Sequence, residues 1–500
     1  MKYIILGSGI AGMAATEAIR GKDEAAEILM ISAEKELCFN RPMLIGEFAL
    51  DESGAVLFEK QQDWPAQHKV EVRLDTKVVA IDRAAKLIRL EDGTAEEYDR
   101  LIYALGAHVT IPPIPGADGD NVYVVRTRED MAEIREAMKS AKHAVVIGGG
   151  MLGLEDAWAM REQKLDVAIV EQKQRVAFGQ IDQSAGNLMK KRIERMGVPV
   201  YVNATVTEIG DGYVSFLQEV SAAASEQVPA QAVPGCDGCS AAQTAELVTI
   251  PADLVILSTG VTPNCSLGAE AGLAVTGRNT DADAADACGG CGACCASQHA
   301  DACCGNLSAG ACWIAVDEYC RTSDPHIFAA GDCAAVNGRN DAIWDEAREM
   351  GRVAGTNAAL DASVEAGSAA LDASAAAEVV QTYYPGELET YVPVTAEHVF
   401  TGFDTEVFTM ADSSGAGTDG VYIRHADVEI FDYQRERYIR VSLQDEIIAG
   451  ILLINASELA PELMEAYHRG AGEEEARQII LHWKENHEVD FKPAAPFTRR

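Results

Sequence analysis

Short apolar runs alternate with longer amphipathic ones in the first third of the chain. Residues 2–7 (KYIILG) are apolar, residues 9–21 (GIAGMAATEAIRG) have the pattern of a helix opened by glycines, and residues 27–32 (EILMIS) are apolar again. A strand, a helix and a second strand in this order predict a βαβ unit. The same order returns at residues 143–171, with HAVVIGGG, MLGLEDAWAMREQ and DVAIVE. Two such units predict an α/β chain with two Rossmann-like dinucleotide-binding domains.

A different pattern begins near residue 379. Strand-like runs such as YVPV, VYIRHADVEIF and RYIRVSL come first, and the helix-like runs ELMEAYHRG and EEEARQIILHW follow. This order predicts a separate C-terminal α+β domain. Because 48% of the 500 residues are hydrophobic, the chain has enough apolar material for several cores.

Three segments depart from these patterns. Residues 217–247 are rich in Ala, Ser and Gln, and residues 277–312 are rich in Ala, Asp, Gly and Cys. We expect both to be inserts. Residues 357–378 are rich in alanine, and most simply they extend a helix or link it to the next domain.

Glycines at fixed spacing open the first predicted helix. Gly7 allows a tight turn, Gly9 lets the backbone approach a pyrophosphate, and Gly12 packs the helix against the strand. The helix N-terminus then faces the phosphates. Glu34, just past the second strand, is placed to accept a hydrogen bond from a ribose hydroxyl. These residues predict a dinucleotide site.

The second βαβ unit repeats the device with Gly148, Gly150, Gly153 and the acid Glu171. A carboxylate at this position accepts from a free ribose 2′-hydroxyl and repels a 2′-phosphate. The sequence therefore favours NAD over NADP, although two basic residues follow the acid closely.

Charge and hydropathy narrow the function classes. The formal net charge is -37, from 78 acidic and 41 basic residues, which argues against nucleic acid and anionic membranes as partners. The sequence has no apolar run long enough to span a membrane. The N-terminus superficially resembles a signal peptide, but its regularly spaced glycines fit a strand and a helix. We therefore expect a cytoplasmic protein.

The order of the motifs resembles that of the pyridine-nucleotide:disulfide oxidoreductases, flavoproteins that bind two dinucleotides. Within this class the chain is most similar to the NADH:rubredoxin oxidoreductase and nitrite reductase flavoprotein branch, through SAEKELCFNRPML at residues 32–44. The resemblance runs from residue 1 to about residue 360 outside the inserts, and more loosely to about residue 470. The other matching motifs are GSGIAG (7–12), YALGA (103–107), VIGGGMLGLE (146–155), LSTGVTPN (257–264), TSDPHIFAAGD (322–332) and REMGRVAGTNAA (348–359).

The resemblance implies a domain division. It implies a FAD-binding domain of the three-layer ββα type at residues 1–113 and 263–375, which contains the cysteine-rich insert 277–312. An NAD-binding domain is implied at residues 114–262, with the insert 217–247. Residues 379–500 are implied to form an α+β interface domain.

The resemblance also implies roles for single residues. Glu155 would lie at the contact between nicotinamide and flavin, and its alternative is an ordinary exposed glutamate on a helix. Asp332 would bind the ribityl chain. The implied FAD-binding set is Gly7, Gly9, Gly12, Glu34, Arg41, Pro42, Val78, Gly106 and Asp332, with Arg41 and Pro42 near the flavin and Val78 and Gly106 lining it. The implied NAD-binding set is Gly148, Gly150, Gly153, Glu171 and Gly260.

A reactive thiol is one point where the chain departs from relatives. It lacks the early Cys-x4-Cys pair of the disulfide reductases, and Cys38 is the nearest match to the single cysteine of peroxide- and thiol-reducing members. A catalytic Cys38 needs a lowered pKa in an accessible, electropositive site. The alternative is a small core residue beside the flavin. We expect Cys265, Cys320 and Cys333 to be packing residues.

The two inserts hold nine of the thirteen cysteines. Thiolates at CxxC spacing can share one metal ion, and CxxCxxC is also the spacing of iron–sulfur ligands. The inserts are therefore candidates for zinc or an iron–sulfur cluster, but redox thiols and a passive, low-complexity insert are alternatives, and the polar composition favours the last. The metal candidates are Cys236, Cys239, Cys288, Cys291 and Cys294.

The expected function follows from the resemblance. It implies a FAD-dependent oxidoreductase that takes hydride from NADH and passes electrons to a small redox protein such as rubredoxin. The alternatives are an NADH oxidase or peroxidase that uses a small oxidant, a disulfide reductase, and the flavin subunit of a larger electron-transfer complex. The sequence leaves the acceptor open, and also the choice between a homodimer and a subunit of a complex.

Overall fold

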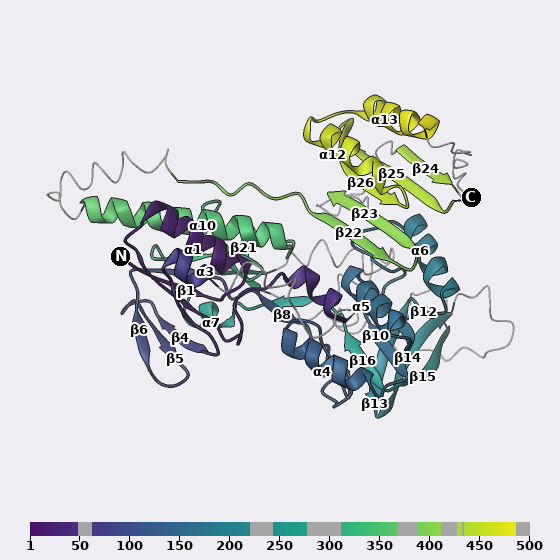
Figure 1. Cartoon of the computed structure of the whole chain (residues 1–500), viewed down its shortest axis with the longest axis horizontal. Coiled ribbons are helices and arrows are strands. Elements are labelled where there is room, and N and C mark those ends of the chain that lie inside the picture. Colours follow the sequence, from purple (N-terminus) through teal and green to yellow (C-terminus); the bar gives the residue numbers. More distant parts are fainter. Residues whose placement is uncertain are drawn as a thin grey trace, which may run out of the picture.

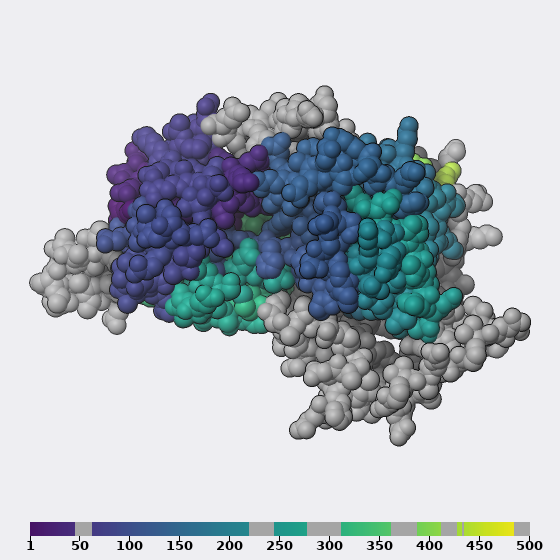
Figure 2. All heavy atoms as spheres, turned by 90° about the horizontal axis from the view of Figure 1, so that it is seen from below, coloured from purple at the N-terminus to yellow at the C-terminus, as the bar shows by residue number. Residues whose placement is uncertain are grey.

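A computed structural model describes residues 1–48, 63–220, 244–277, 312–368, 388–411, 428–432 and 435–486. These residues form two α/β bodies and a C-terminal body that lies against the second of them (Figure 1). Seen from below, the surface is hollowed where the two α/β bodies meet (Figure 2). Within the described residues, no helix combines the length and apolar character needed to cross a membrane.

The first body is built on a five-stranded parallel sheet, and its N-terminal strand and helix are as predicted. In spatial order the strands are β20 (Ile327–Ala329), β7 (Arg100–Tyr103), β1 (Lys2–Leu6), β2 (Glu27–Ile31) and β3 (Glu71–Arg73). Helices α1 (Ile10–Lys22) and α10 (Trp344–Ser368) cover one face (Figure 1). The two helices approach closely at glycines: a Cβ on Gly351 would lie 2.2 Å from the Ala11 carbonyl oxygen. The alanine-rich stretch therefore extends a helix as far as Ser368.

Smaller elements complete the first body. An antiparallel meander covers the other face of the sheet, and its buried Ile81 and Ile88 join the core of the first body. A further three-stranded sheet carries the chain into and out of the cysteine-rich insert. The meander consists of β4 (Val78–Asp82), β5 (Leu87–Leu90) and β6 (Ala95–Glu97). The further sheet consists of β18 (Val275–Gly277), β19 (Cys312–Val316) and β21 (Ala334–Val336). The short helices are η1 (Arg41–Phe48), α3 (Trp64–His68) and α7 (Ser266–Glu270).

The second body repeats the parallel sheet. Its strands are β12 (Val200–Tyr201), β11 (Asp166–Val170), β10 (His143–Ile147), β16 (Leu254–Leu257) and β9 (Val122–Tyr123), and its helices are α4 (Arg128–Met138), α5 (Met151–Glu162) and α6 (Gln183–Arg195). An antiparallel sheet of β13 (Ala204–Gly210), β14 (Gly212–Val220) and β15 (Thr244–Ala252) packs beside it. The predicted insert 217–247 was too wide, because the paired strands reach Val220 and resume at Thr244.

Two antiparallel segments connect the α/β bodies. β8 (Ala107–Val109) leaves the first body, and β17 (Val261–Pro263) returns beside it. Their pairing holds the motifs YALGA and LSTGVTPN side by side, although these lie about 150 positions apart in the chain.

The C-terminal body is an antiparallel sheet with helices on one face, as the α+β prediction requires. The strands lie in the order β22 (Glu397–Gly402), β23 (Thr405–Ala411), β26 (Ile447–Ile454), β25 (Arg437–Gln444) and β24 (Val428–Asp432), and the helices are η2 (Ser457–Leu459), α12 (Ala460–His468) and α13 (Glu473–Asn486). The prediction of a strand at YVPV is wrong, since residues 391–394 lie outside the sheet. Tyr391 is instead buried, and its hydroxyl group donates to Glu346 of α10 at 3.1 Å.

The C-terminal sheet packs directly on α5 and α6 of the second body. Trp158 of α5 meets the ring of Phe403 edge to face, with 5.1 Å between centroids. Arg440 and the Tyr438 hydroxyl group both donate to Asp182, whose side chain also caps α6. The aromatic contact therefore holds α5, the helix that carries the second glycine motif, and the buried polar cluster at Asp182 holds the start of α6.

Candidate dinucleotide and redox site

The first glycine turn has the close contacts that its sequence predicts. Gly7 has φ +102°, and a Cβ there would lie 2.2 Å from the Ala104 carbonyl oxygen. A Cβ on Gly12 would lie 2.1 Å from the Gly7 oxygen. In contrast, no heavy atom of the described residues lies within 4 Å of a Cβ on Gly9. Gly7 and Gly12 therefore have no room for a side chain, whereas the space beside Gly9 at the start of α1 is open. This arrangement fits a pyrophosphate bound at the helix N-terminus.

The second turn has nearly the same geometry. Gly148 has φ +109°, and its Cβ would lie 2.2 Å from the Ser258 carbonyl oxygen, while a Cβ on Gly153 would lie 2.1 Å from the Gly148 oxygen. The Cβ position of Gly150 is again open with respect to the described chain. The molecule therefore has two glycine turns of the same geometry. We call residues 7–12 at the N-terminus of α1 the first cradle, and residues 148–153 at the N-terminus of α5 the second cradle.

The acids predicted to contact ribose lie beside these turns. The Glu171 carboxylate accepts from the backbone N–H of Gly149 at 2.5 Å and of Lys173 at 2.6 Å, so it faces its glycine turn. Burial raises the pKa of Glu171, and the two N–H donors oppose that rise. Glu34 instead pairs with the guanidinium of Arg41 at 2.8 Å. Both carboxylates are held at strand ends, where a ribose hydroxyl could reach them.

Arg126 connects residues that the sequence could only list separately. Its guanidinium lies 3.3 Å from the Asp332 carboxylate, and its Nη2 would lie 3.8 Å from a Cβ on Gly106. Its carbonyl oxygen accepts a hydrogen bond from Arg41. Burial lowers the pKa of Arg126, with Arg41 adding to the effect. Sequence reasoning missed this residue, although it directly precedes the capping box of α4 in RTRED.

Val78 and Pro42 are two further members of the predicted flavin set, and their roles stay predictions. The chain leading to Val78 runs beside the first strand ends, because the Thr76 N–H donates to Ser32 and the Asp75 N–H donates to Glu34. Val78 therefore follows a segment that is hydrogen-bonded to Ser32 and Glu34. Pro42 is exposed at the start of η1.

Glu155 lies in the first turns of α5, immediately after the second cradle. It is half-buried, and burial alone raises its pKa to about 7. Gly260 lies shortly after β16 with φ +87°, and no heavy atom of the described residues lies within 4 Å of a Cβ placed on it. A carboxyl group with a raised pKa beside a dinucleotide cradle is a candidate functional group.

Four of the five cysteines in the described chain are buried, and Cys312 is partly exposed. Cys38 is 3% exposed, its thiol donates weakly to the Phe39 carbonyl at 3.6 Å, and burial raises its pKa to about 12. This environment favours the packing interpretation of Cys38 over the reactive one. Cys320 and Cys333 are buried in the same core. The expectation for Cys265 is corrected, because it forms a disulfide with Cys312.

The metal candidates lie outside the described residues; they are Cys236, Cys239, Cys288, Cys291 and Cys294. In the part of the chain that the structure describes, no cluster of three or more His, Cys, Asp or Glu side chains could hold a metal ion. The proposal of zinc or an iron–sulfur cluster therefore stays a prediction.

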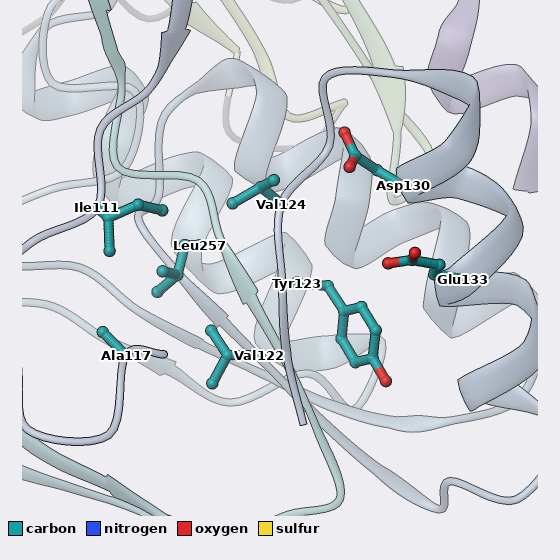
Figure 3. A pocket seen from close by; sticks show the side chains of 8 residues that line it. All are labelled: Ile111, Ala117, Val122, Tyr123, Val124, Asp130, Glu133 and Leu257. Carbon is teal, nitrogen blue, oxygen red and sulfur yellow. The ribbon is translucent and has the colours of Figure 1, made fainter. Parts of the chain in front are cut away.

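A small hollow of about 140 Å³ lies at the edge strand of the second body (Figure 3). The carboxylates of Asp130 and Glu133 lie on one side of the β9 segment, and apolar side chains lie on the other. The Asp130 carboxylate is already used, since it accepts from the N–H groups of Arg126 and Thr127. The remaining lining residues are Ile111, Ala117, Val122, Tyr123, Val124 and Leu257.

Comparison with known proteins identifies relatives over most of this architecture. A family model described as pyridine nucleotide-disulphide oxidoreductase matches residues 1–285 and 307–360. The large subunit of an NADH nitrite reductase from Escherichia coli K12 is 27% identical over 356 residues, which is 71% of this chain and 35% of that protein. The chain thus spans about a third of the length of that relative.

Two further proteins match over more of their own length. The NADH-rubredoxin oxidoreductase of Clostridium acetobutylicum is 26% identical over 357 residues, 71% of this chain and 74% of the relative. A solved NAD-dependent persulfide reductase from A. fulgidus superposes with a TM-score of 0.69 at 22% identity, covering 99% of this chain and 80% of that one. The structural likeness shows the shared fold.

Proposed function

Because the chain belongs to the pyridine nucleotide-disulphide oxidoreductase family, we propose that it is a FAD-dependent oxidoreductase that takes hydride from NADH. In this proposal the electrons pass to a small redox protein such as rubredoxin. The observation that carries it is the pair of glycine cradles: at Gly7 and at Gly148 an added Cβ would lie 2.2 Å from a carbonyl oxygen, whereas the Cβ positions of Gly9 and Gly150 at the helix N-termini are open. One cradle serves FAD and the other serves NADH.

The first cradle and the Arg126 cluster suit FAD. Gly9 would admit the pyrophosphate, Glu34 would accept from the ribose, and Asp332 with Gly106 would meet the ribityl and flavin end. FAD supplies hydride acceptance and the change from two-electron to one-electron transfer. The protein contributes orientation and charge: Arg126 and Arg41 place positive charge beside Asp332 and Glu34.

The second cradle suits NADH. Gly150 would admit the pyrophosphate, and the Glu171 carboxylate, oriented by two backbone N–H groups, would accept from a free 2′-hydroxyl. A 2′-phosphate would meet the same carboxylate and be repelled, which supports NADH over NADPH. Glu155 would lie at the nicotinamide end of this cradle.

A redox protein is favoured as acceptor over a thiol-dependent reaction. The relative from Clostridium acetobutylicum carries rubredoxin in its name, and its match covers 74% of its length. Peroxide or disulfide reduction through Cys38 would require a thiolate, whereas burial raises the pKa of that thiol to about 12.

Anaerobic stopped-flow spectroscopy tests the proposal. The flavin-loaded, full-length protein is mixed with NADH or NADPH, and the bleaching of the flavin is followed. Reduced protein is then mixed separately with rubredoxin, oxygen, hydrogen peroxide and a small disulfide. We expect NADH to reduce the flavin faster than NADPH, and rubredoxin to reoxidise it fastest. Absence of bound flavin, or no bleaching by either nucleotide, would overturn the proposal.

A second candidate is the flavin subunit of a larger electron-transfer complex. The observation that favours it is the 35% coverage of the nitrite reductase large subunit, in which the matching region is one part of a longer chain. Tagged protein purified under mild conditions tests this candidate. Partner subunits at fixed stoichiometry support it, and a homogeneous single-chain species with rubredoxin activity contradicts it.

A further inference from the structure

Asp156 is a buried carboxyl group for which the proposed function has no role. Its side chain is 1% exposed, and its Oδ2 accepts a hydrogen bond from the Ser258 hydroxyl at 3.0 Å. Its Oδ1 is buried and has no hydrogen-bond partner among the described residues. Burial of a half-satisfied carboxyl group is costly, so its place in the second body needs an explanation.

The hydrogen bond joins two segments on either side of the second cradle. Asp156 follows Glu155 in the first turns of α5, and Ser258 is the first residue after β16. The Ser258 carbonyl oxygen is the atom that would lie 2.2 Å from a Cβ on Gly148. The Ser258 Cβ would lie 3.2 Å from a Cβ on Gly153. Ser258 therefore packs directly against the glycine turn.

The segment after Ser258 is hydrogen-bonded to the connection between the two α/β bodies. The Thr259 hydroxyl donates to the Thr110 carbonyl oxygen at 2.6 Å, which ties this segment to the strand that leaves the first body. Gly260 follows with an open Cβ position. Two side-chain hydrogen bonds therefore hold the turn at residues 258–260, one to Asp156 of α5 and one to Thr110 of the connection, beside the backbone hydrogen bonds from Ser258 N–H to Ile147 and from Thr110 N–H to Gly260.

We propose that Asp156 is a positioning residue for hydride transfer, acting through Ser258. Its hydrogen bond holds the turn 258–260 against α5, so that Gly260 on one side and Glu155 on the other keep the nicotinamide in one orientation. This role rests on the proposed oxidation of NADH. A small displacement of a bound reactant lowers the rate of transfer far more than it lowers affinity.

The hydrogen bond, and not the charge, carries this role. Burial raises the pKa of Asp156 to about 7, which places the neutral carboxyl within the working pH range. An amide at this position retains an oxygen that accepts from Ser258. Asp156→Asn should therefore preserve the coupling, whereas Asp156→Leu and Ser258→Ala remove it.

The experiment uses flavin-loaded, full-length protein and two readouts. Hydrogen–deuterium exchange is measured over residues 257–263, and the limiting rate of flavin reduction and the Kd for NAD⁺ are measured separately. For Asp156→Leu and for Ser258→Ala we expect exchange to speed up about tenfold and the limiting rate to fall about tenfold or more, with Kd changing less than about threefold. Asp156→Asn should stay within about twofold of the parent protein.

A matched control comes from the same body. Ser215 is buried and shares a hydrogen bond of 2.9 Å with Thr249 in the antiparallel sheet, away from both cradles. Ser215→Ala should leave exchange at 257–263 and flavin reduction unchanged. If Asp156→Leu does not fold, the exchange and the rate of flavin reduction measured for Ser258→Ala decide whether the inference holds.

Three results would overturn the inference. These are unchanged exchange and rate in Ser258→Ala, an equal rise in Kd and fall in rate, or an Asp156→Asn protein as slow as Asp156→Leu. Failure of the proposed function looks different, because the parent protein itself would not be reduced by NADH, while the exchange measurement would still report on the coupling.

Discussion

Gly150→Ala separates nucleotide binding from folding more cleanly than any other substitution in the second cradle. Gly150 has φ −67° and ψ 176°, which alanine adopts without strain, and no described heavy atom lies within 4 Å of the new Cβ. Alanine is a poorer N-cap residue than glycine by roughly 1 kcal/mol, and the stiffer unfolded chain offsets about 0.4–1 kcal/mol of this cost. The free energy of unfolding should therefore change by less than about 1 kcal/mol.

The same substitution should weaken nucleotide binding strongly. The Cβ would occupy the space through which a pyrophosphate approaches the backbone N–H groups. A hydrogen bond to a charged group contributes about 1.5–3 kcal/mol, so its loss weakens NADH binding about 10- to 150-fold. Gly153→Ala is the contrast, because its Cβ would lie 2.1 Å from the Gly148 oxygen and forces the backbone itself to move.

The assay combines calorimetric titration of NAD⁺ with thermal unfolding and flavin quantification. For Gly150→Ala we expect weaker NAD⁺ binding, an unfolding midpoint within a few degrees of the parent, and full FAD content. For Gly153→Ala we expect both affinity and midpoint to fall. Unchanged NAD⁺ affinity in Gly150→Ala would refute the assignment of this turn as the pyrophosphate cradle.

Three further predictions concern the remaining site. Cys38→Ser should leave flavin reduction and turnover with rubredoxin within about twofold, because a thiol with a pKa near 12 is not ionised; loss of turnover with every acceptor would restore a thiol mechanism. Relative to the parent, Asp156→Asn should gain stability as pH rises from about 4 to about 7 and the gain should level off above pH 7, because between the ordinary pKa of 3.8 and about 7 the native state keeps a proton that the unfolded state has lost; at about 1.4 kcal/mol per pH unit the upper limit is about 4 kcal/mol, and a pH-independent difference in thermal unfolding would contradict this. Asp332→Ala should lose FAD on gel filtration while Asp332→Asn keeps more of it, and equal flavin content in both would show that this carboxylate does not hold the cofactor.

Local pattern was enough to predict both glycine turns. The 3.6-residue and two-residue periods place apolar side chains on helices and strands, and the glycine spacing reports contacts within about five residues. The close approaches of Gly12 to Gly7 and of Gly153 to Gly148 are of this short range. The strand predicted at YVPV is absent: Tyr391 is buried and donates to Glu346 of α10, whereas Val392 is exposed and the segment pairs with no strand of the described chain.

Contacts between distant parts of the chain could not be predicted in this way. Arg126 meets Asp332, Asp156 meets Ser258, and Cys265 meets Cys312, across separations of 206, 102 and 47 residues. No periodicity links such positions, because only the packing of complete sheets brings them together. The raised pKa values of Cys38 and Glu155 could not be predicted from the local sequence either, since burial by surrounding elements raises them.

The sequence by itself determined the two βαβ units, their glycine cradles and the carboxylates at the strand ends, because each depends on neighbours in the chain. The tertiary structure decided which residues face one another across those cradles. It placed Arg126 beside Asp332, packed the C-terminal sheet on α5 and α6, and buried Asp156 against Ser258. These outcomes depend on how whole layers pack and exclude water, a property of the folded molecule that no short stretch of sequence encodes.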